Sequence, residues 1–353
     1  METENRKQNA KTKQALLLAA VVICACAICL AVFCLASKRT DAREVKLLIL
    51  PHFENGEMAG DFPGEAQLFY EAYFDGASQS YDIDGGYTLY YNPKNKIAMC
   101  VTGSGKANTT VCLTSLLCDE DFDLSNAYIL TLGCAGGAVE YTNLGDVCLV
   151  TGAYDFDVGY TCDPRELTEE GSTWFYDDTF DGTGGRSLNL ELVQELYEQV
   201  KDTELETTEI SKKIMSESFD AASWAVREPQ VILGSAITSD SYWKGTYSHG
   251  KAVEICEYYG AEYPYAISEM EDTPTAIAAD KLGMLDRLVI LRVSVNTDVF
   301  MNGDTPETLW GGGEKFSEKI EEANSETLDI FEPAMRNLFK VGQQVIEILV
   351  AKA

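Results

Sequence analysis

The stretch Val45-Lys46-Leu47-Leu48-Ile49-Leu50-Pro51 is the first strand-like segment of the chain, and it determines the expected fold. A short apolar run without alternation is typical of a strand buried on both faces of a parallel sheet. Similar runs recur at 97–102, 127–132, 146–151, 230–236 and 287–295. Helical patterns occupy 105–117, 188–200, 247–259, 273–283 and 314–351, the last with a break expected near Pro333. Strands that alternate with helices predict an α/β protein with a parallel or mixed central sheet flanked by helices on both faces.

Upstream of this strand, residues 15–36 carry no charge and are almost wholly apolar. The run is long enough to cross a bilayer as a helix. Basic residues precede it, so residues 1–14 are expected to stay in the cytoplasm. The length favours an uncleaved transmembrane anchor over a signal segment, whose cleavage near Ala36 would release a secreted protein. Residues 37–45 then form a linker, and 46–353 form a domain outside the cytoplasm, held at the cell membrane.

The net charge and the numbers of cysteines and histidines argue against a nucleic-acid partner and against a metal site. The 353 residues carry a formal net charge of −30, which repels phosphate backbones, so nucleic acid is not an expected partner. Four of the eleven cysteines fall in the apolar segment and seven lie beyond it, an odd number with no C-x-x-C pair. The chain has only two histidines, so no metal site is expected, and no cofactor motif is present.

In α/β sheets of this kind, ligands bind at the carboxyl ends of the strands. Gly103-Ser104-Gly105 follows one apolar run and opens a helix, where free N–H groups attract anions or hydroxyls; the alternative is a tight turn. The small residues from Gly133 to Gly137, including Cys134, Ala135 and Gly136, follow another run. They indicate either close packing of chain segments or a floor for a flat ligand.

Acidic residues accompany two further segments. Glu269-Met270-Glu271-Asp272 opens a helix, where the helix dipole ordinarily accounts for acidic residues. The functional alternative is that these carboxylates bind sugar hydroxyls, with the methionine as an apolar surface beneath the ring. Glu54 follows the first strand, in a position common for exposed loop glutamates. Neither histidine has a nucleophile motif around it, so no catalytic triad is expected.

Taken in order, these segments resemble the nucleoside phosphorylase and nucleosidase superfamily, and most closely its purine nucleoside permease family. The resemblance spans about 46–300. It rests on the following stretches: Phe53-Glu54, Pro63-Gly64-Glu65-Ala66-Gln67-Leu68, VTGSGKANTT at 101–110, GCAGGAVEYTNLGDV at 133–147, Ser239-Asp240, Tyr242-Trp243, EMEDT at 269–273 and LRVSVN at 291–296.

The resemblance implies a site for a purine nucleoside, in which one set of residues binds the ribose and another binds the base. Glu271 is similar to the carboxylate that binds ribose hydroxyls, with Met270 under the sugar. Tyr242 and Trp243 are similar to residues that flank the base, and Asn296 takes the place of the Asp or Asn that contacts the purine ring. The resemblance also gives Glu54 the role of the carboxylate that activates water. Members of the superfamily commonly form oligomers, so a homo-oligomer is an open expectation.

Two departures from the superfamily bear on the reaction. The loop at 101–110 contains Lys106 but no arginine for phosphate, which resembles the nucleosidase branch. Asn296 stands where nucleosidases usually place Asp, and an amide cannot protonate a leaving purine, so Asp298 becomes the candidate acid.

The first hypothesis for the function is that the protein binds purine nucleosides outside the cytoplasm and cleaves them as a nucleosidase does, in the service of nucleoside uptake. The alternatives are a non-catalytic nucleoside-binding protein and phosphorolysis with Lys106 holding phosphate. One apolar segment cannot line a pore, so the permease label is expected to mean capture or processing of nucleosides.

Overall fold

A computed structural model describes residues 42–168, 171–172, 174–175, 182–217, 227–300 and 314–353, with only the backbone described at 314–329. The predicted segments 1–14 and 15–36 lie outside the described residues. No helix within the described ranges is long and apolar enough to cross a membrane.

The chain divides into two compact units. Residues 1–44 and 119–123 form the first, whose described part is a short parallel pair of strands, β1 (Arg43–Glu44) and β6 (Phe122–Asp123). Residues 45–118 and 124–353 form the second, which contains the main sheet.

The main sheet contains every strand that the apolar runs predicted. Residues at the centre of these strands are fully buried, because strands in the middle of the sheet have neighbours and helices on all sides. The six strands are β2 (Leu47–Leu50), β5 (Ile97–Cys100), β7 (Tyr128–Gly137), β8 (Val147–Asp155), β12 (Val231–Thr238) and β14 (Leu288–Thr297).

Four further strands of the sheet were not predicted. β3 (Gln79–Ile83) and β4 (Tyr87–Asn92) form an antiparallel hairpin at one edge, and β11 (Gly185–Ser187) lies at the other. β13 (Tyr265–Glu269) lies between β12 and β7. A separate short pair, β9 (Tyr160–Thr161) with β10 (Trp174–Phe175), lies outside this sheet and coincides with none of the apolar runs.

The sheet is mixed, and part of it closes on itself. Its strand order is β11-β8-β12-β13-β7-β2-β5-β4-β3. β14 pairs in parallel with β7 and antiparallel with β8, so β8, β12, β13, β7 and β14 form a closed ring. The carboxyl ends of β2, β5, β7 and β14 therefore meet at one end of the sheet, since these four strands run parallel.

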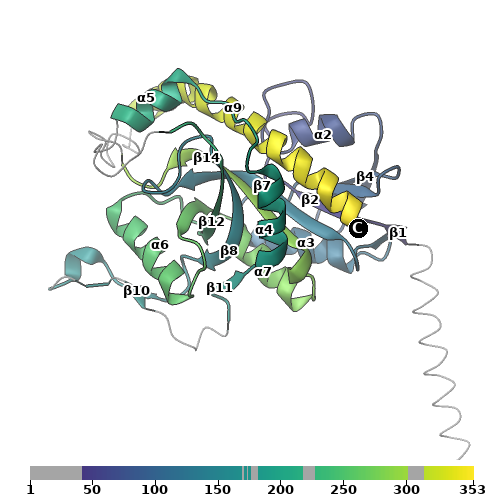
Figure 1. Ribbon diagram of the computed structural model, residues 1–353, viewed down its shortest axis with the longest axis horizontal. Helices are drawn as coiled ribbons and strands as arrows, with labels where there is room; N and C mark the ends of the chain where they lie inside the picture. Colours follow the sequence, from purple (N-terminus) through teal and green to yellow (C-terminus); the bar gives the residue numbers. More distant parts are fainter. Residues whose placement is uncertain (1–41, 169–170, 173, 176–181, 218–226, 301–313) are drawn as a thin grey trace, which may run out of the picture. The chain divides into compact units, whose positions relative to one another are not determined.

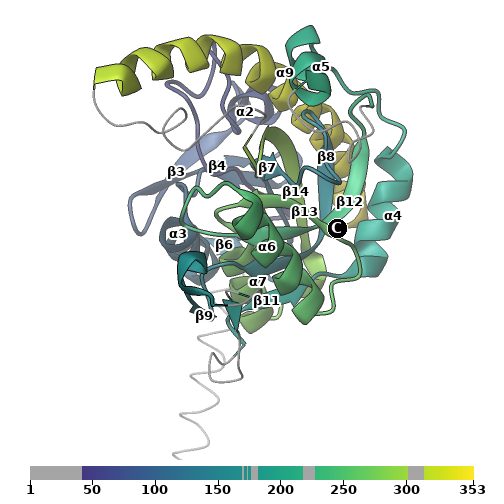
Figure 2. The same ribbon diagram turned by 90° about the vertical axis from the view of Figure 1, so that its left-hand side faces the viewer.

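Helices cover the sheet on both sides, as predicted. α9 (Glu314–Lys352) lies across one side and contacts β7 and β14 together with α2 (Gln67–Tyr73), α4 (Leu190–Val200) and α5 (Glu209–Glu217) (Figure 1). On the other side, α7 (Asp272–Lys281) packs on β8 and β12 beside α3 (Lys106–Cys118). Figure 2 shows α6 (Thr246–Tyr258) in front of β13. Short 3₁₀ turns occur at η2 (Pro164–Glu166) and η4 (Leu285–Arg287).

The break expected near Pro333 does not occur, because α9 continues through this proline without interruption. Proline removes a single N–H from the helical hydrogen bonds. The following turns bury Ala334, Leu338, Val341 and Leu349 completely, so packing of this face against the sheet outweighs the lost bond.

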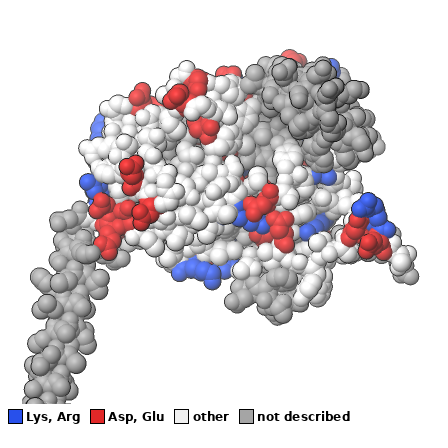
Figure 3. Space-filling model, turned by 180° about the vertical axis from the view of Figure 1, so that it is seen from behind, with Lys and Arg blue, Asp and Glu red and all other residues white. Residues whose placement is uncertain are grey.

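The described surface is acidic in patches. Figure 3 shows acidic side chains in several groups on the face seen from behind, with basic side chains in small separate groups. A nucleic-acid-binding surface would instead carry a continuous basic stripe.

Candidate functional site

A cavity of about 140 Å³ lies where the carboxyl ends of the central strands meet. Its position agrees with the rule that α/β sheets bind ligands at these ends. None of its lining residues, all within the described part of the chain, is Lys or Arg. They are His52, Phe53, Glu65, Ser104, Cys134, Ala135, Gly136, Tyr242, Ser268, Glu269, Met270, Glu271, Val295 and Asn296.

Glu65 is a buried carboxylate in the wall of this cavity. Its Oε2 accepts hydrogen bonds from the backbone N–H of His52 (2.7 Å) and of Phe53 (3.3 Å), and its Oε1 accepts one from Cys134 N–H (2.8 Å). Burial raises the pKa of Glu65 to about 7, although the nearby positive charge of Arg292 and these hydrogen bonds act in the opposite direction. A carboxyl group that titrates near neutrality is suited to general acid–base chemistry.

Two glycines of the small-residue stretch make room for the functional side chains. A Cβ at Gly133 would lie 2.5 Å from Glu65 Oε1 and 2.6 Å from Arg292 Nη1. A Cβ at Gly136 would lie 2.8 Å from Ser268 Oγ and 2.9 Å from Asn296 Oδ1. The residues of this stretch therefore pack closely, and Cys134, Ala135 and Gly136 line the cavity. That they form a floor for a flat ligand stays a prediction.

A β-bulge directs two residues of β14 into the cavity. The pairing register of β14 with β7 shifts between Ser294 and Asn296, which leaves Val295 without a partner on β7. A bulge of this kind re-aims the neighbouring side chains. Val295 and Asn296 both line the cavity as a result.

Arg292 is completely buried beneath the cavity, among three carboxylates. Its Nη2 lies 2.6 Å from Asp272 Oδ1, 3.1 Å from Glu271 Oε2 and 3.3 Å from Glu269 Oε2. One cation cannot neutralise three ionised carboxylates, which favours a proton on one of them. Glu269 is the best candidate, because burial and the charge of Asp272 raise its pKa to about 8.

His52 is neutral, and its tautomer follows from its neighbours. Its Nε2 lies 3.1 Å from Arg292 Nη2, which can only donate, so Nε2 must accept. Nδ1 therefore carries the proton and donates to Thr102 Oγ1 at 2.7 Å. Burial lowers the pKa of His52 to about 3, in agreement with a neutral ring.

Two hydrogen bonds hold the carboxylate of Glu271 at the wall of the cavity. Its Oε1 accepts the backbone N–H of Gly105 at 2.8 Å, and its Oε2 accepts from Arg292. Gly105 adopts a φ of +89°, which glycine tolerates and which directs its N–H toward the carboxylate. Each carboxylate oxygen keeps a further acceptor position, so Glu271 can accept two hydroxyl groups from a ligand.

Lys106 forms ion pairs outside the cavity. Its ammonium lies 2.8 Å from Asp155 Oδ1 and 2.7 Å from Asp157 Oδ2, and it does not line the cavity. Of the residues predicted from the glycine loop, Ser104 lines the cavity, Gly105 holds Glu271, and Gly103 forms the preceding turn with a φ of +80°.

Three predicted site residues point away from this cavity. The carboxylate of Glu54 accepts the backbone N–H groups of Asn55, Gly64, Ala66 and Gln67, so it fixes the loop before α2. Trp243 stacks on Phe156, with ring centroids 4.8 Å apart. Asp298 binds His249 and Tyr265, which both line a different cavity.

The remaining predicted residues line the cavity together: Tyr242, Glu269, Met270, Glu271 and Asn296. Sequence reasoning missed His52, Glu65 and Arg292. Glu65 lies in one of the stretches that carried the resemblance, Pro63 to Leu68, but the loop from Phe53 must fold back before its carboxylate reaches the cavity.

The closed ring, the cavity at its strand ends and the carboxylate facing it define a protein of the nucleoside phosphorylase and nucleosidase fold. Solved structures support this class, and at 13–15% identity they show the fold alone. The 5'-methylthioadenosine/S-adenosylhomocysteine nucleosidase of Neisseria meningitidis, in complex with methylthio-immucillin-A, matches at a TM-score of 0.53 over 87% of this chain and 99% of its own. The futalosine hydrolase of Helicobacter pylori matches at 0.53 over 86% and 98%.

The family is narrower than the fold. The model of the purine nucleoside permease (NUP) family matches residues 44–353, so the chain belongs to that family. A Schizosaccharomyces pombe protein named as a probable purine nucleoside permease is 27% identical over 237 residues, which cover 60% of this chain and 67% of that protein.

Proposed function

We propose that this protein binds purine nucleosides outside the cytoplasm and hydrolyses their N-glycosidic bond, and that this reaction serves nucleoside uptake. The observation that carries the proposal is the buried Glu65, which faces the same cavity as Glu271 and has a pKa raised to about 7. The family membership and the nucleosidase-like fold support the choice of a purine nucleoside.

In the proposed reaction, Glu271 accepts hydrogen bonds from the ribose hydroxyls, and Met270 packs beneath the sugar. Glu65 accepts a proton from a water molecule as the water oxygen forms a bond to C1' of the ribose. The C1'–N9 bond breaks, and its electron pair goes to the purine. Asn296 and Tyr242 contact the departing base, which takes up a proton to give the free base, while the sugar leaves as ribose.

This assignment gives Glu65 the role that the resemblance suggested for Glu54. The Glu54 carboxylate accepts four backbone N–H groups, whereas Glu65 faces the cavity. Asp298 likewise lies outside the first cavity, bound to His249 and Tyr265, so the proposed reaction proceeds without a carboxylic acid at the base.

Hydrolysis is favoured over phosphorolysis by the charge of the cavity. Its described lining contains carboxylates and no cationic side chain, and Lys106 is paired with Asp155 and Asp157. A phosphate dianion would meet repulsion there.

The experiment is chromatography of the products after the full-length protein is incubated with inosine, guanosine or adenosine, with and without phosphate. Hydrolysis predicts free base and ribose in buffer without phosphate. Release that requires phosphate, with ribose 1-phosphate as the product, would show phosphorolysis. Saturable binding without products would show that the protein binds nucleosides but does not cleave them.

A further inference from the structure

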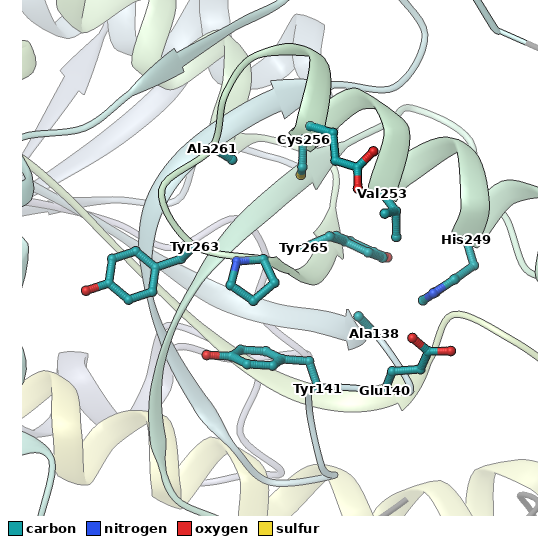
Figure 4. Close-up of a pocket in the computed structure, with 11 residues that line it drawn as sticks. Ala138, Glu140, Tyr141, His249, Val253, Cys256, Ala261, Tyr263 and Tyr265 are labelled. Carbon is teal, nitrogen blue, oxygen red and sulfur yellow. The ribbon is translucent and has the colours of Figure 1, made fainter. Parts of the chain in front are cut away.

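A second cavity, of about 310 Å³, lies beside α6 and the start of β13, apart from the residues that line the first (Figure 4). Its lining is mostly apolar and aromatic, with few polar groups, which is typical of a small-molecule site. The lining residues are Ala138, Glu140, Tyr141, His249, Val253, Cys256, Glu257, Ala261, Tyr263, Pro264 and Tyr265.

Two tyrosine rings form the walls of this cavity, and hydrogen bonds hold both in place. Figure 4 shows the rings of Tyr141 and Tyr265 nearly edge-on, at different places among the residues that line the cavity. The Tyr141 hydroxyl donates to the backbone oxygen of Leu233 at 2.8 Å. The Tyr265 hydroxyl donates to Asp298 Oδ2 at 3.0 Å. The cavity, called the slot below, therefore has two aromatic side chains in its wall that hydrogen bonds hold in place.

The end of the slot carries one oriented hydrogen-bond donor and one acceptor. His249 Nδ1 lies 2.7 Å from Asp298 Oδ2, and Asp298 is fully buried and also accepts the N–H of Val139 at 3.2 Å. This contact leaves Nε2 as the ring nitrogen that can serve a ligand. Figure 4 shows the carboxylate of Glu140 beside the His249 ring.

The charge state of His249 supports the role of a donor. Burial alone lowers its pKa, but the hydrogen bond and charge of Asp298, with the charge of Glu140, more than offset burial and raise the pKa. The protonated form of the ring, which Asp298 and Glu140 favour, donates from both nitrogens and offers Nε2–H to a ligand.

We propose that this slot is a second binding site, which holds a flat nitrogen heterocycle between Tyr141 and Tyr265. Nε2–H of His249 donates to an acceptor on the edge of the ring, and Glu140 accepts from an adjacent N–H. The edge of hypoxanthine, with its carbonyl oxygen beside a ring N–H, has this pairing. The choice of a purine base among such heterocycles rests on the proposed function, because free base is the product of that reaction.

The test is calorimetric titration of the full-length protein with hypoxanthine. The wild type is expected to show two sites. Tyr141→Ala removes one wall and should weaken the second site at least tenfold, because stacking on an aromatic ring contributes strongly to base binding. Tyr141→Phe keeps the ring and is the matched control, with binding close to wild type. Glu140→Ala removes the acceptor from an exposed position and should weaken the same site several-fold.

Inosine cleavage by the same proteins separates this inference from the proposed function. Tyr141→Ala should leave the initial rate of base release unchanged, since Tyr141 does not line the first cavity. One hypoxanthine site in the wild type, or equal binding by Tyr141→Ala and Tyr141→Phe, would overturn the second site even if inosine is cleaved. Two sites with the expected sensitivity, without any cleavage of inosine, would overturn the proposed function and support the second site.

Discussion

At the scale of single residues, the cavity combines side chains that the sequence indicated with side chains that only folding brings there. Glu271 and Asn296 were predicted from the resemblance of the stretches 269–273 and 291–296 to the superfamily, and both line the cavity. Glu65 was not predicted as a site residue, because it belongs to a loop whose path depends on hydrogen bonds to Glu54. A carboxylate role is readable from a motif, but the direction of a loop side chain is not.

Glu271→Gln tests whether the Glu271 carboxylate binds the ribose hydroxyls. The change removes the negative charge that two ribose hydroxyls would meet, and a hydrogen bond to a charged group contributes about 1.5–3 kcal/mol. We expect inosine to bind about tenfold more weakly, or worse, in calorimetric titration. Thermal melts should be run in parallel, because Glu271 also contacts Arg292. Glu57→Gln, at an exposed loop position, is the matched control. Equal inosine affinity in both variants would show that other residues bind the ribose.

Asn296→Asp tests the contact with the base. The amide of Asn296 can donate to a purine oxygen and accept from a ring N–H, which suits inosine and guanosine better than adenosine. A carboxyl group can instead protonate the leaving base, and general acid catalysis contributes about 10²–10⁴-fold. The variant should shift preference toward adenosine, measured as base release from inosine and adenosine. No change in the ratio of the two rates would show that Asn296 does not touch the base.

At the scale of elements, the apolar runs predicted the strands at the centre of the sheet but not those at its edges. β3 and β4 are partly exposed hairpin strands, so their sequences lack a continuous apolar run. The prediction of a helix break near Pro333 was wrong, because tertiary packing of α9 outweighed the local preference of proline to end a helix. The bulge at Val295 could not be read from the sequence either, since it depends on the register between β14 and β7.

Arg292→Met tests how β14 and the segment before α7 are held together. The variant leaves Glu269, Glu271 and Asp272 buried without their cation, and breaking such a group costs about 3–5 kcal/mol. The charge of Arg292 lowers the pKa of each of these three carboxyl groups, so Arg292 stabilises their ionised forms, and this stabilisation is present at high pH and lost as pH falls. Urea denaturation should therefore show a larger deficit for the variant at pH 8 than at pH 5.

Arg186→Met is the control for this prediction. Arg186 pairs with Asp280 on the surface, where an ion pair contributes about 0–1 kcal/mol. A similar loss of stability in both variants, or a deficit for Arg292→Met that does not change with pH, would show that Arg292 acts only by filling space.

At the scale of the whole molecule, the family name describes transport, whereas the described fold is that of nucleosidases. We expect residues 15–36 to anchor the chain with its folded part outside the cytoplasm. Cell fractionation should recover the full-length protein with the membrane, and protease added to intact cells should digest it. Full-length protein in the cytosol, or a mature chain beginning near Ser37 in the medium, would contradict the anchor.

The central claim is that Glu65 activates water in the first cavity, and the most direct measurement is the pH dependence of base release from inosine. A general base must be ionised, so the rate should rise with pH and reach half its maximum near pH 7, the value to which burial raises the pKa of Glu65. Glu65→Gln should lower the rate about 10²-fold or more and abolish this dependence. Glu54→Gln, which alters the hydrogen bonds of the loop, should lower the melting temperature but keep the pH profile. A Glu65→Gln variant with the rate and pH profile of the wild type would contradict the account.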